Sequence, residues 1–281
     1  MADLDLTRRQ ALTALAAAGG YALAADPVLA QAIKTDTKGL VAGTVNVAGA
    51  DGTPIPVYEA YPDQAGEFPV VVVVSEVWGV HEWIKDVTRR FAKEGYYAVA
   101  PELFSREGGL AQVTDMSRIM SVVLNAPLAR IVGDLRAAAD YARKQPAASG
   151  DRVGATGFCW GGGVALLFGA RYKDTKALVS WYGAITRALK DDPKPVAPLD
   201  VAGQIPCPVL LLYSGIDQGI PVADVEKMEA ALRAAGRPVE KVIYPDAPHG
   251  FLADYRPSYR PEAARDGWTR CLAWFQKYLK A

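Results

Sequence analysis

The sequence contains little histidine and little cysteine, and it has no excess of charge of either sign. Its 31 lysines and arginines balance 31 aspartates and glutamates, so neither a basic surface for nucleic acid nor an acidic tail is indicated. The 3 cysteines lack metal-binding spacing, and 281 residues bury enough apolar surface to fold without a disulfide scaffold. Because the chain has 2 histidines, any imidazole chemistry must use His81 or His249.

The composition is otherwise that of a globular protein. Hydrophobic residues make up 51% of the chain and charged residues 22%, which excludes disorder, collagen and a protein with several membrane spans. No internal repeat or low-complexity linker divides residues 33–281, so we expect a single domain there.

Residues 1–32 have the organisation of a bacterial export signal. Arg8-Arg9 precedes a weakly apolar run over residues 11–25, and Ala30-Gln31-Ala32 offers a small-residue cleavage site. The run is too short and too rich in alanine and glycine to form a stable membrane anchor. We therefore expect the twin-arginine machinery to export the folded protein to the periplasm or beyond, with cleavage near Ala32–Ile33. An N-terminal amphipathic helix is the alternative, although no polar residues recur at helical spacing to form its second face.

The rest of the chain alternates between strand and helix patterns. A continuous β-branched run at residues 70–74 indicates a strand buried on both faces, as in a parallel sheet. Strands are expected at 40–47, 56–61, 68–75, 96–100, 152–156, 177–182, 209–213 and 239–244, and helices at 84–94, 111–124, 128–144, 163–170, 222–235 and 261–279. This order predicts a doubly wound, mostly parallel α/β sheet with helices on both faces and an antiparallel N-terminal edge. The proline-rich residues 191–208 are expected to form a long loop within the domain.

A candidate nucleophile lies between a predicted strand and a predicted helix. Gly157-Phe158-Cys159-Trp160-Gly161 has the pattern Gly-x-Cys-x-Gly, which is that of a nucleophile elbow with cysteine in place of serine. Glycines on either side avoid clashes in such a sharp turn, and a helix N-terminus favours the thiolate. The alternative is a small buried cysteine beside helix-packing glycines.

A base and an acid follow Cys159 in the order that a hydrolase triad requires. His249 lies in the loop after the last predicted strand, and Asp217 directly follows the strand at 209–213. An aspartate in a glycine-rich loop often only caps a turn, and Asp224 is a second candidate, expected in the next helix and facing solvent. The order Cys159, Asp217, His249 on successive strand ends nevertheless indicates a triad.

Taken together, these motifs resemble the dienelactone hydrolase family, also called carboxymethylenebutenolidases, within the α/β hydrolases. The resemblance covers roughly residues 45–279. It rests on Ser75-Glu76-Val77-Trp78-Gly79, Pro101-Glu102-Leu103-Phe104, the cysteine elbow, the Asp217 loop and Pro248-His249-Gly250-Phe251. It implies an α/β-hydrolase fold and Cys-His-Asp cleavage of a small lactone or carboxylic ester, with no metal or organic cofactor.

The resemblance also implies roles for residues around the cysteine. Glu76 is expected to contact Cys159 and to accept its proton, since burial can raise the pKa of a carboxyl group enough for this task. The backbone N–H groups of Val77 and Trp160 are expected to form the oxyanion hole. Arg106 matches a family arginine that binds the carboxylate of the substrate.

Other positions are less specific or depart from the family pattern. The second carboxylate-binding arginine of the family, four residues after the histidine, is Ala253 here, and Arg256 is nearby but not equivalent. Trp78 and Tyr182 are expected to line the substrate pocket, although aromatic residues at strand ends are more often core. His81 is expected to shape the Glu76 loop or cap the following helix, not to act in catalysis.

Two alternatives remain open for function, and one for the remaining cysteines. The first functional alternative is a broader esterase, thioesterase or peptidase on the same fold, and the second is a non-catalytic periplasmic binding protein. A disulfide between Cys207 and Cys271 is compatible with the periplasm but cannot be deduced from the sequence.

Overall fold

The computed structural model describes residues 33–280, so the expected signal peptide at residues 1–32 lies outside the described residues. The strands are β1 (Leu40–Ala48), β2 (Pro54–Pro62), β3 (Phe68–Val74), β4 (Tyr97–Pro101), β5 (Ala148–Phe158), β6 (Thr175–Trp181), β7 (Val209–Ser214) and β8 (Val239–Tyr244). The helices are α2 (Glu82–Lys93), α3 (Met116–Asn125), α4 (Leu128–Ala142), α5 (Trp160–Arg171), α6 (Val222–Ala234) and α7 (Pro261–Leu279), with 3₁₀ turns η1 (Ser105–Glu107) and η2 (Pro198–Gln204).

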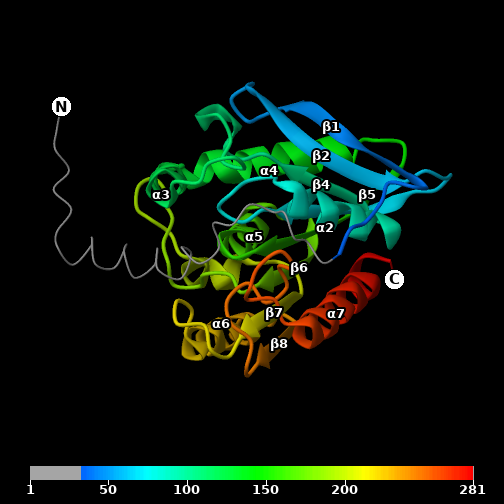
Figure 1. The fold of residues 1–281 in the computed structure, drawn as a ribbon. Helices are drawn as coiled ribbons and strands as arrows, with labels where there is room; N and C mark the ends of the chain where they lie inside the picture. The colour runs from blue at the N-terminus through cyan, green and yellow to red at the C-terminus, as the bar shows by residue number, and fades with distance from the viewer. Residues whose placement is uncertain (1–32, 281) are drawn as a thin grey trace, which may run out of the picture.

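These strands form one 8-stranded sheet in the order β1-β2-β4-β3-β5-β6-β7-β8 (Figure 1). β1 pairs antiparallel with β2, and β2 pairs antiparallel with β4. Every pairing from β4 through β3 to β8 is parallel. The prediction of a mostly parallel sheet with an antiparallel N-terminal edge is therefore confirmed.

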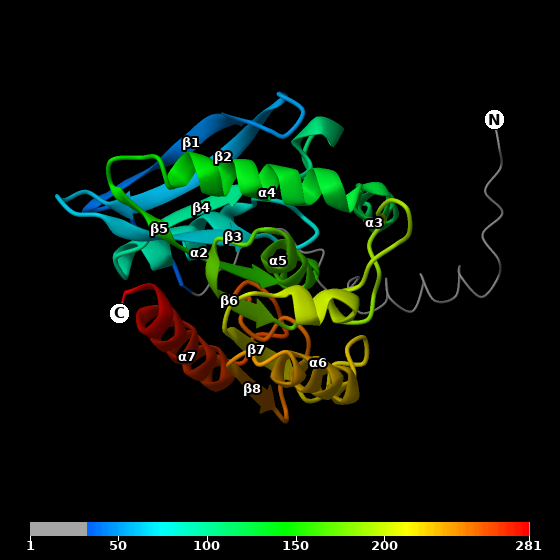
Figure 2. The same ribbon diagram turned by 180° about the vertical axis from the view of Figure 1, so that it is seen from behind.

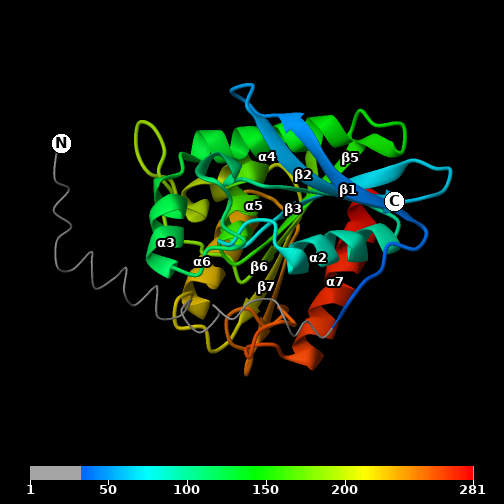
Figure 3. The ribbon, with the colours of Figure 1, turned by 45° about the horizontal axis from the view of Figure 1, so that its top comes forward.

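Helices cover both faces of the sheet. α2 and α7 lie together on one face, where Phe91 packs against Phe275 with ring centroids 5.9 Å apart (Figure 3). α4 and α5 lie on the opposite face, and Figure 2 shows α4 running across the strands there. β3 is thus covered from both sides, which explains why Val70 and its valine neighbours are fully buried.

Two helices begin three or more residues away from their predicted starts. α3 begins at Met116, not at residue 111, because the Asp115 carboxylate caps it by accepting from the backbone N–H of Ser117. α5 begins at Trp160, before the glycine run that lowers helix propensity. These glycines are present because α5 packs on backbone: a Cβ at Gly161 would lie 2.2 Å from the Ser75 carbonyl oxygen.

The proline-rich loop is part of the domain and contains one short helical turn. η2 lies inside the proline-rich loop expected at residues 191–208, and contacts α5 and α6. Within residues 33–280, no helix combines the length and apolar character needed to cross a bilayer.

Candidate active site

Cys159 occupies a strained turn between β5 and α5. Its backbone has φ 57° and ψ −123°, a conformation that residues other than glycine rarely adopt. The turn brings backbone so close that a Cβ at Gly157 would lie 2.0 Å from the Gly161 carbonyl oxygen. Cys159 is the N-cap residue of α5 and is 1% exposed. This is the geometry of a nucleophile elbow, as the glycine spacing predicted.

His249 and Asp217 meet beyond the ends of the neighbouring strands β7 and β8. The His249 Nδ1 atom lies 2.6 Å from an Asp217 carboxylate oxygen. The other Asp217 oxygen accepts a hydrogen bond from the Gly219 backbone N–H at 2.8 Å, which fixes the carboxylate. Asp224 lies in α6 and pairs instead with Lys227 at 2.8 Å. Of the two candidate acids, Asp217 is the one that contacts the His249 imidazole.

The surroundings of His249 favour its protonated form. Burial opposes a charge on the ring, but the Cys159 side chain and the Asp217 carboxylate outweigh it and raise the His249 pKa to about 10. The interaction with Cys159 places the histidine next to the elbow, with Asp217 on its other side. The three side chains therefore form a chain of contacts from Cys159 through His249 to Asp217.

Tyr182 packs against this chain from the end of β6. Its ring meets the His249 ring edge-on at 5.1 Å, and its φ of 40° is the other positive value outside glycine within residues 33–280. Strained backbone of this kind tends to gather at functional sites. The buried Tyr182 hydroxyl has no hydrogen-bond partner among the described residues. The expected contact of Tyr182 with a substrate stays a prediction.

Glu76 follows β3 and is held as a buried carboxylate. One oxygen pairs with Arg256 Nη2 at 2.8 Å, although the N–H is not aligned as a hydrogen bond. The other accepts from the Tyr255 hydroxyl at 2.7 Å and lies 3.6 Å from His81 Nε2. Burial alone would raise the Glu76 pKa, but Arg256, His81 and Tyr255 together lower it to about 2. The Glu76 pKa is therefore lowered, not raised as burial alone suggested, and the expected transfer of the Cys159 thiol proton to Glu76 stays a prediction.

Arg256 is the site residue that the sequence did not assign. Its side chain is 4% exposed, and its guanidinium lies over the Trp78 ring at 4.5 Å from the centroid. The Arg256 Nε atom donates to the Tyr255 hydroxyl at 3.0 Å. Trp78, expected at the pocket, thus serves as a cation–π platform for this arginine. Neither periodicity nor motif spacing pairs residue 256 with residue 76, which is 180 positions earlier.

Arg106, expected to bind a substrate carboxylate, is already neutralised. Its guanidinium pairs with Asp134 at 2.6 Å and with Asp51 at 2.7 Å. Asp134 belongs to α4 and Asp51 to the turn between β1 and β2, so the arginine joins these two elements. A substrate carboxylate would have to break both ion pairs, and the structure does not support that role for Arg106.

Val77 and Trp160 follow the ends of adjacent parallel strands, since Val74 pairs with Gly157 between β3 and β5. Their oxyanion-hole role stays a prediction. The loop after Val77 is held by Glu102, which accepts from the Val80 backbone N–H at 2.7 Å. Burial raises the pKa of Glu102 above its ordinary value.

The remaining cysteines are structural. Cys207 and Cys271 are both free and buried, so they form no disulfide with each other. Burial raises the pKa of Cys207 to about 12, which makes it an inert thiol. Among residues 33–280, no three histidine, cysteine or acidic side chains are grouped to hold a metal ion.

Changing Arg256 to methionine is expected to destabilise the fold by about 3–5 kcal/mol, because Glu76 would remain as a buried charge without its partner. The native Glu76 pKa lies below that of the unfolded chain, so the pair stabilises above about pH 4.5 and loses this effect as the pH falls towards about 2. In the variant, acidification from pH 7 should instead stabilise. Urea unfolding across this pH range measures both effects.

The control for this prediction is the double variant Glu76→Gln with Arg256→Met, which removes both charges and should recover much of the lost stability. Equal stability of the single variant and the native protein would contradict a buried ion pair at this position.

An 8-stranded, mostly parallel sheet with a nucleophile elbow, and with a histidine and an aspartate beyond the following strands, defines an α/β hydrolase. The chain belongs to the dienelactone hydrolase family, whose sequence profile matches residues 55–279.

Similar proteins agree with this assignment. A "Putative carboxymethylenebutenolidase" of Methylorubrum extorquens is 48% identical over 282 residues, covering 99% of this chain and 95% of the relative. A protein of the same name from Escherichia coli strain K12 is 43% identical over 263 residues, covering 92% of this chain and 95% of the relative. The crystal structure of a "Putative Dienelactone Hydrolase" from Klebsiella pneumoniae is 42% identical with a TM-score of 0.80, covering 85% of this chain and 99% of that chain.

Proposed function

We propose that the protein hydrolyses a small lactone or carboxylic ester with Cys159 as nucleophile. The observation that carries this proposal is the contact chain from the strained elbow through His249 to Asp217. A cysteine held on such a turn beside a protonated imidazole suits attack on a carbonyl carbon. No bound metal or organic cofactor is needed for any step.

In the proposed mechanism, the Cys159 thiolate attacks the carbonyl carbon, and the backbone N–H groups of Val77 and Trp160 bind the resulting oxyanion. The intermediate collapses to a thioester as His249 gives its proton to the leaving alkoxide. His249 then takes a proton from water, whose oxygen attacks the thioester and releases the acid and the Cys159 thiolate. Asp217 keeps the imidazole oriented throughout.

Glu76 has a positioning role in this proposal. Because it is ionised and bound by Arg256, Tyr255 and His81, it holds the loop of residues 255 and 256 against the loop after β3. Val77 follows Glu76 directly, so this contact fixes the backbone that supplies one oxyanion donor.

A broader esterase acting on neutral substrates is the second candidate. The observation in its favour is that Asp51 and Asp134 neutralise Arg106, and Glu76 neutralises Arg256. Arg187 offers another cation. It lines a shallow hollow beside Trp160, where an acidic substrate would meet it. The ratio of kcat/KM for acidic lactones to that for neutral esters distinguishes the two candidates.

The test of the proposed function is a hydrolysis screen of the purified protein over lactones and simple esters, followed by rapid acid quenching with a good substrate. Peptide mass spectrometry should find the acyl group on the peptide that contains Cys159. Turnover with the acyl group on another residue would contradict the proposed nucleophile, and absence of any turnover would favour a non-catalytic binding protein.

We also propose that the protein is exported to the periplasm, or secreted, through the twin-arginine route. The proposal is supported by Arg8-Arg9, by the weakly apolar run that follows and by Ala30-Gln31-Ala32. Nothing in the composition indicates a nucleic-acid partner, so the expected partners are the export machinery and a small-molecule substrate.

Replacing both Arg8 and Arg9 with lysine is expected to leave the precursor in the cytoplasm, because the twin-arginine receptor reads the paired guanidinium groups. Cell fractionation and immunoblotting measure the periplasmic share, and a single Arg8→Lys variant provides a graded control. Continued export of the double variant through this route would contradict the signal assignment.

A further inference from the structure

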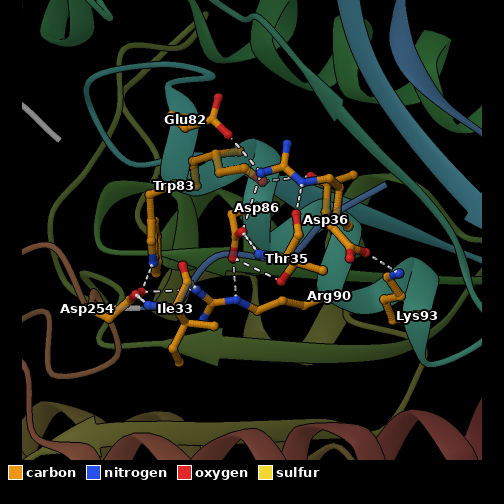
Figure 4. Close-up of polar contacts among 12 residues, drawn as sticks. Ile33, Thr35, Asp36, Glu82, Trp83, Asp86, Arg90, Lys93 and Asp254 are labelled. Atoms are coloured by element: carbon orange, nitrogen blue, oxygen red, sulfur yellow. Dashed lines mark hydrogen bonds and ion pairs between the residues drawn. The ribbon is translucent and has the colours of Figure 1, made fainter. Parts of the chain in front are cut away.

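The backbone of Ile33, beside the expected cleavage site, is hydrogen-bonded to a buried carboxylate. The Ile33 backbone N–H donates to Asp254 at 2.6 Å (Figure 4). Asp254 has a fully buried side chain, and it also accepts from Trp83 Nε1 at 2.6 Å and from Arg90 at 3.1 Å. Ile33 itself lies at the surface and is 42% exposed. A buried acid thus faces the nitrogen atom of a surface residue.

The segment that follows Ile33 is fixed along α2. The Thr35 backbone N–H donates to Asp86 at 2.6 Å, and the Thr35 carbonyl accepts from Arg89 at 2.8 Å. Asp36 pairs with Lys93 at 2.6 Å (Figure 4). The position of the Ile33 nitrogen is therefore set by several contacts, not by the Asp254 bond alone.

The charges around Asp254 leave room for another cation. Arg90 is shared between Asp86 and Asp254 (Figure 4). Arg89 is shared between Asp86 and Glu82. Two guanidinium groups therefore serve three carboxylates. A positive charge on the Ile33 nitrogen would balance this network.

Asp254 is linked to the candidate active site through its sequence neighbours and through Trp83. It directly precedes Tyr255 and Arg256, which hold Glu76. Its partner Trp83 packs against Tyr255 at 5.7 Å between ring centroids. Trp83 also packs against Phe158, the residue before Cys159, at 5.1 Å. A change in the hydrogen bonding of Asp254 would therefore alter the positions of Tyr255 and Arg256 and, through Trp83, the packing of Phe158 before Cys159.

We propose that cleavage of the Ala32–Ile33 bond creates an α-ammonium group that pairs with Asp254 and locks the loop of residues 249–256. Hydrolysis leaves the new carboxylate on Ala32 and the new amine, protonated, on Ile33. The donor that faces the Asp254 carboxylate then changes from a neutral amide N–H to an ammonium group, so an ion pair is added to the existing hydrogen bond. The inference rests on the proposed export signal and adds to it a consequence for the enzyme: removal of the signal completes the site.

The experiment compares two purified forms of the chain, one beginning at Ile33 and one beginning at Ala30. The longer form keeps the amide and lacks the charge. We expect the unfolding equilibrium constant of the Ile33 form to be smaller by about tenfold, and hydrogen exchange in residues 249–256 to be slower. In the Asp254→Asn background, the two forms should be equally stable. In the Asp36→Asn background, the matched control in the same segment, the tenfold difference should persist.

Asp254→Asn also weakens the contacts of Asp254 with Trp83 and Arg90, so its effect is not specific to the Ile33 nitrogen. A second measurement therefore uses the native sequence. An α-amino group with its ordinary pKa of about 7.7–8.0 reacts with acetic anhydride at pH 7 faster than lysines do. The Ile33 amine, facing Asp254 with Arg90, Trp83 and Asp86 around it, should react more slowly than the lysines. Fast acetylation, or equal stability of the two forms, would overturn the proposal.

The N-terminus of the exported protein provides the remaining test. N-terminal sequencing should find Ile33 as the first residue, and any other first residue would overturn the processing step. Stability and acetylation do not depend on turnover. A failure of the proposed hydrolase function would therefore leave both results unchanged and would be recognised separately.

Discussion

Replacing Cys159 with alanine is expected to reduce kcat on the order of 10⁶-fold, by analogy with removal of a serine nucleophile. The side chain is 1% exposed and stands on the elbow in contact with His249, so its removal leaves the imidazole without the thiol that it contacts. Cys207 and Cys271, the other thiols, are both buried. Initial rates with the best substrate from the screen measure the loss, and circular dichroism shows whether the fold is kept.

The serine variant separates two chemistries on the same turn. Cys159→Ser keeps the size and position of the nucleophile but replaces a thiol with a hydroxyl that is far harder to ionise. Glu76 is bound to Arg256 and cannot act as a strong base for that hydroxyl. We therefore expect most activity to be lost here too. A fully active serine variant would show that His249 deprotonates the nucleophile during the reaction, as in an ordinary esterase.

The elements of the fold were largely predictable because their signals are local. The valine run of β3 and the glycine spacing around Cys159 each depend on neighbouring residues only. The N-terminus of α5 was missed for the opposite reason. Its glycines disfavour a helix in isolation, and they are required because β3 and the backbone at Gly183 approach them closely.

The candidate site was predictable in order but not in electrostatics. Cys159, Asp217 and His249 could be chosen because each follows a strand, and strand ends of a parallel sheet meet at one edge. The pKa of Glu76 depends on its ion pair with Arg256. These two residues are far apart in the sequence, and no motif predicts that they pair. Arg106 was assigned to a substrate from the family resemblance, and its partners Asp51 and Asp134 were not foreseen because they come from separate elements. Charge partners formed by tertiary packing are the part of the site that a single sequence does not reveal.

Changing Asp217 to asparagine is expected to lower kcat by about 10⁴-fold while keeping the fold, by analogy with the aspartate of the serine triad. The Asp217 oxygen lies 2.6 Å from His249 Nδ1, and an amide at this place can present an N–H to that atom and so select the wrong imidazole tautomer. The matched control is Asp224→Asn in α6, where the acid serves Lys227 and Thr186 and should be nearly silent in kcat.

The pH dependence distinguishes loss of orientation by Asp217 from a general disturbance of the loop. Asp217 is one of the groups that raise the His249 pKa to about 10, together with Cys159. In Asp217→Asn the imidazolium should therefore lose its proton at a lower pH, and the limb of the kcat/KM profile that reports this group should move in the same direction. NMR titration of the histidine ring measures the shift directly. An unshifted profile with reduced kcat would assign Asp217 a purely structural role, and a large loss in Asp224→Asn would transfer the triad acid to α6.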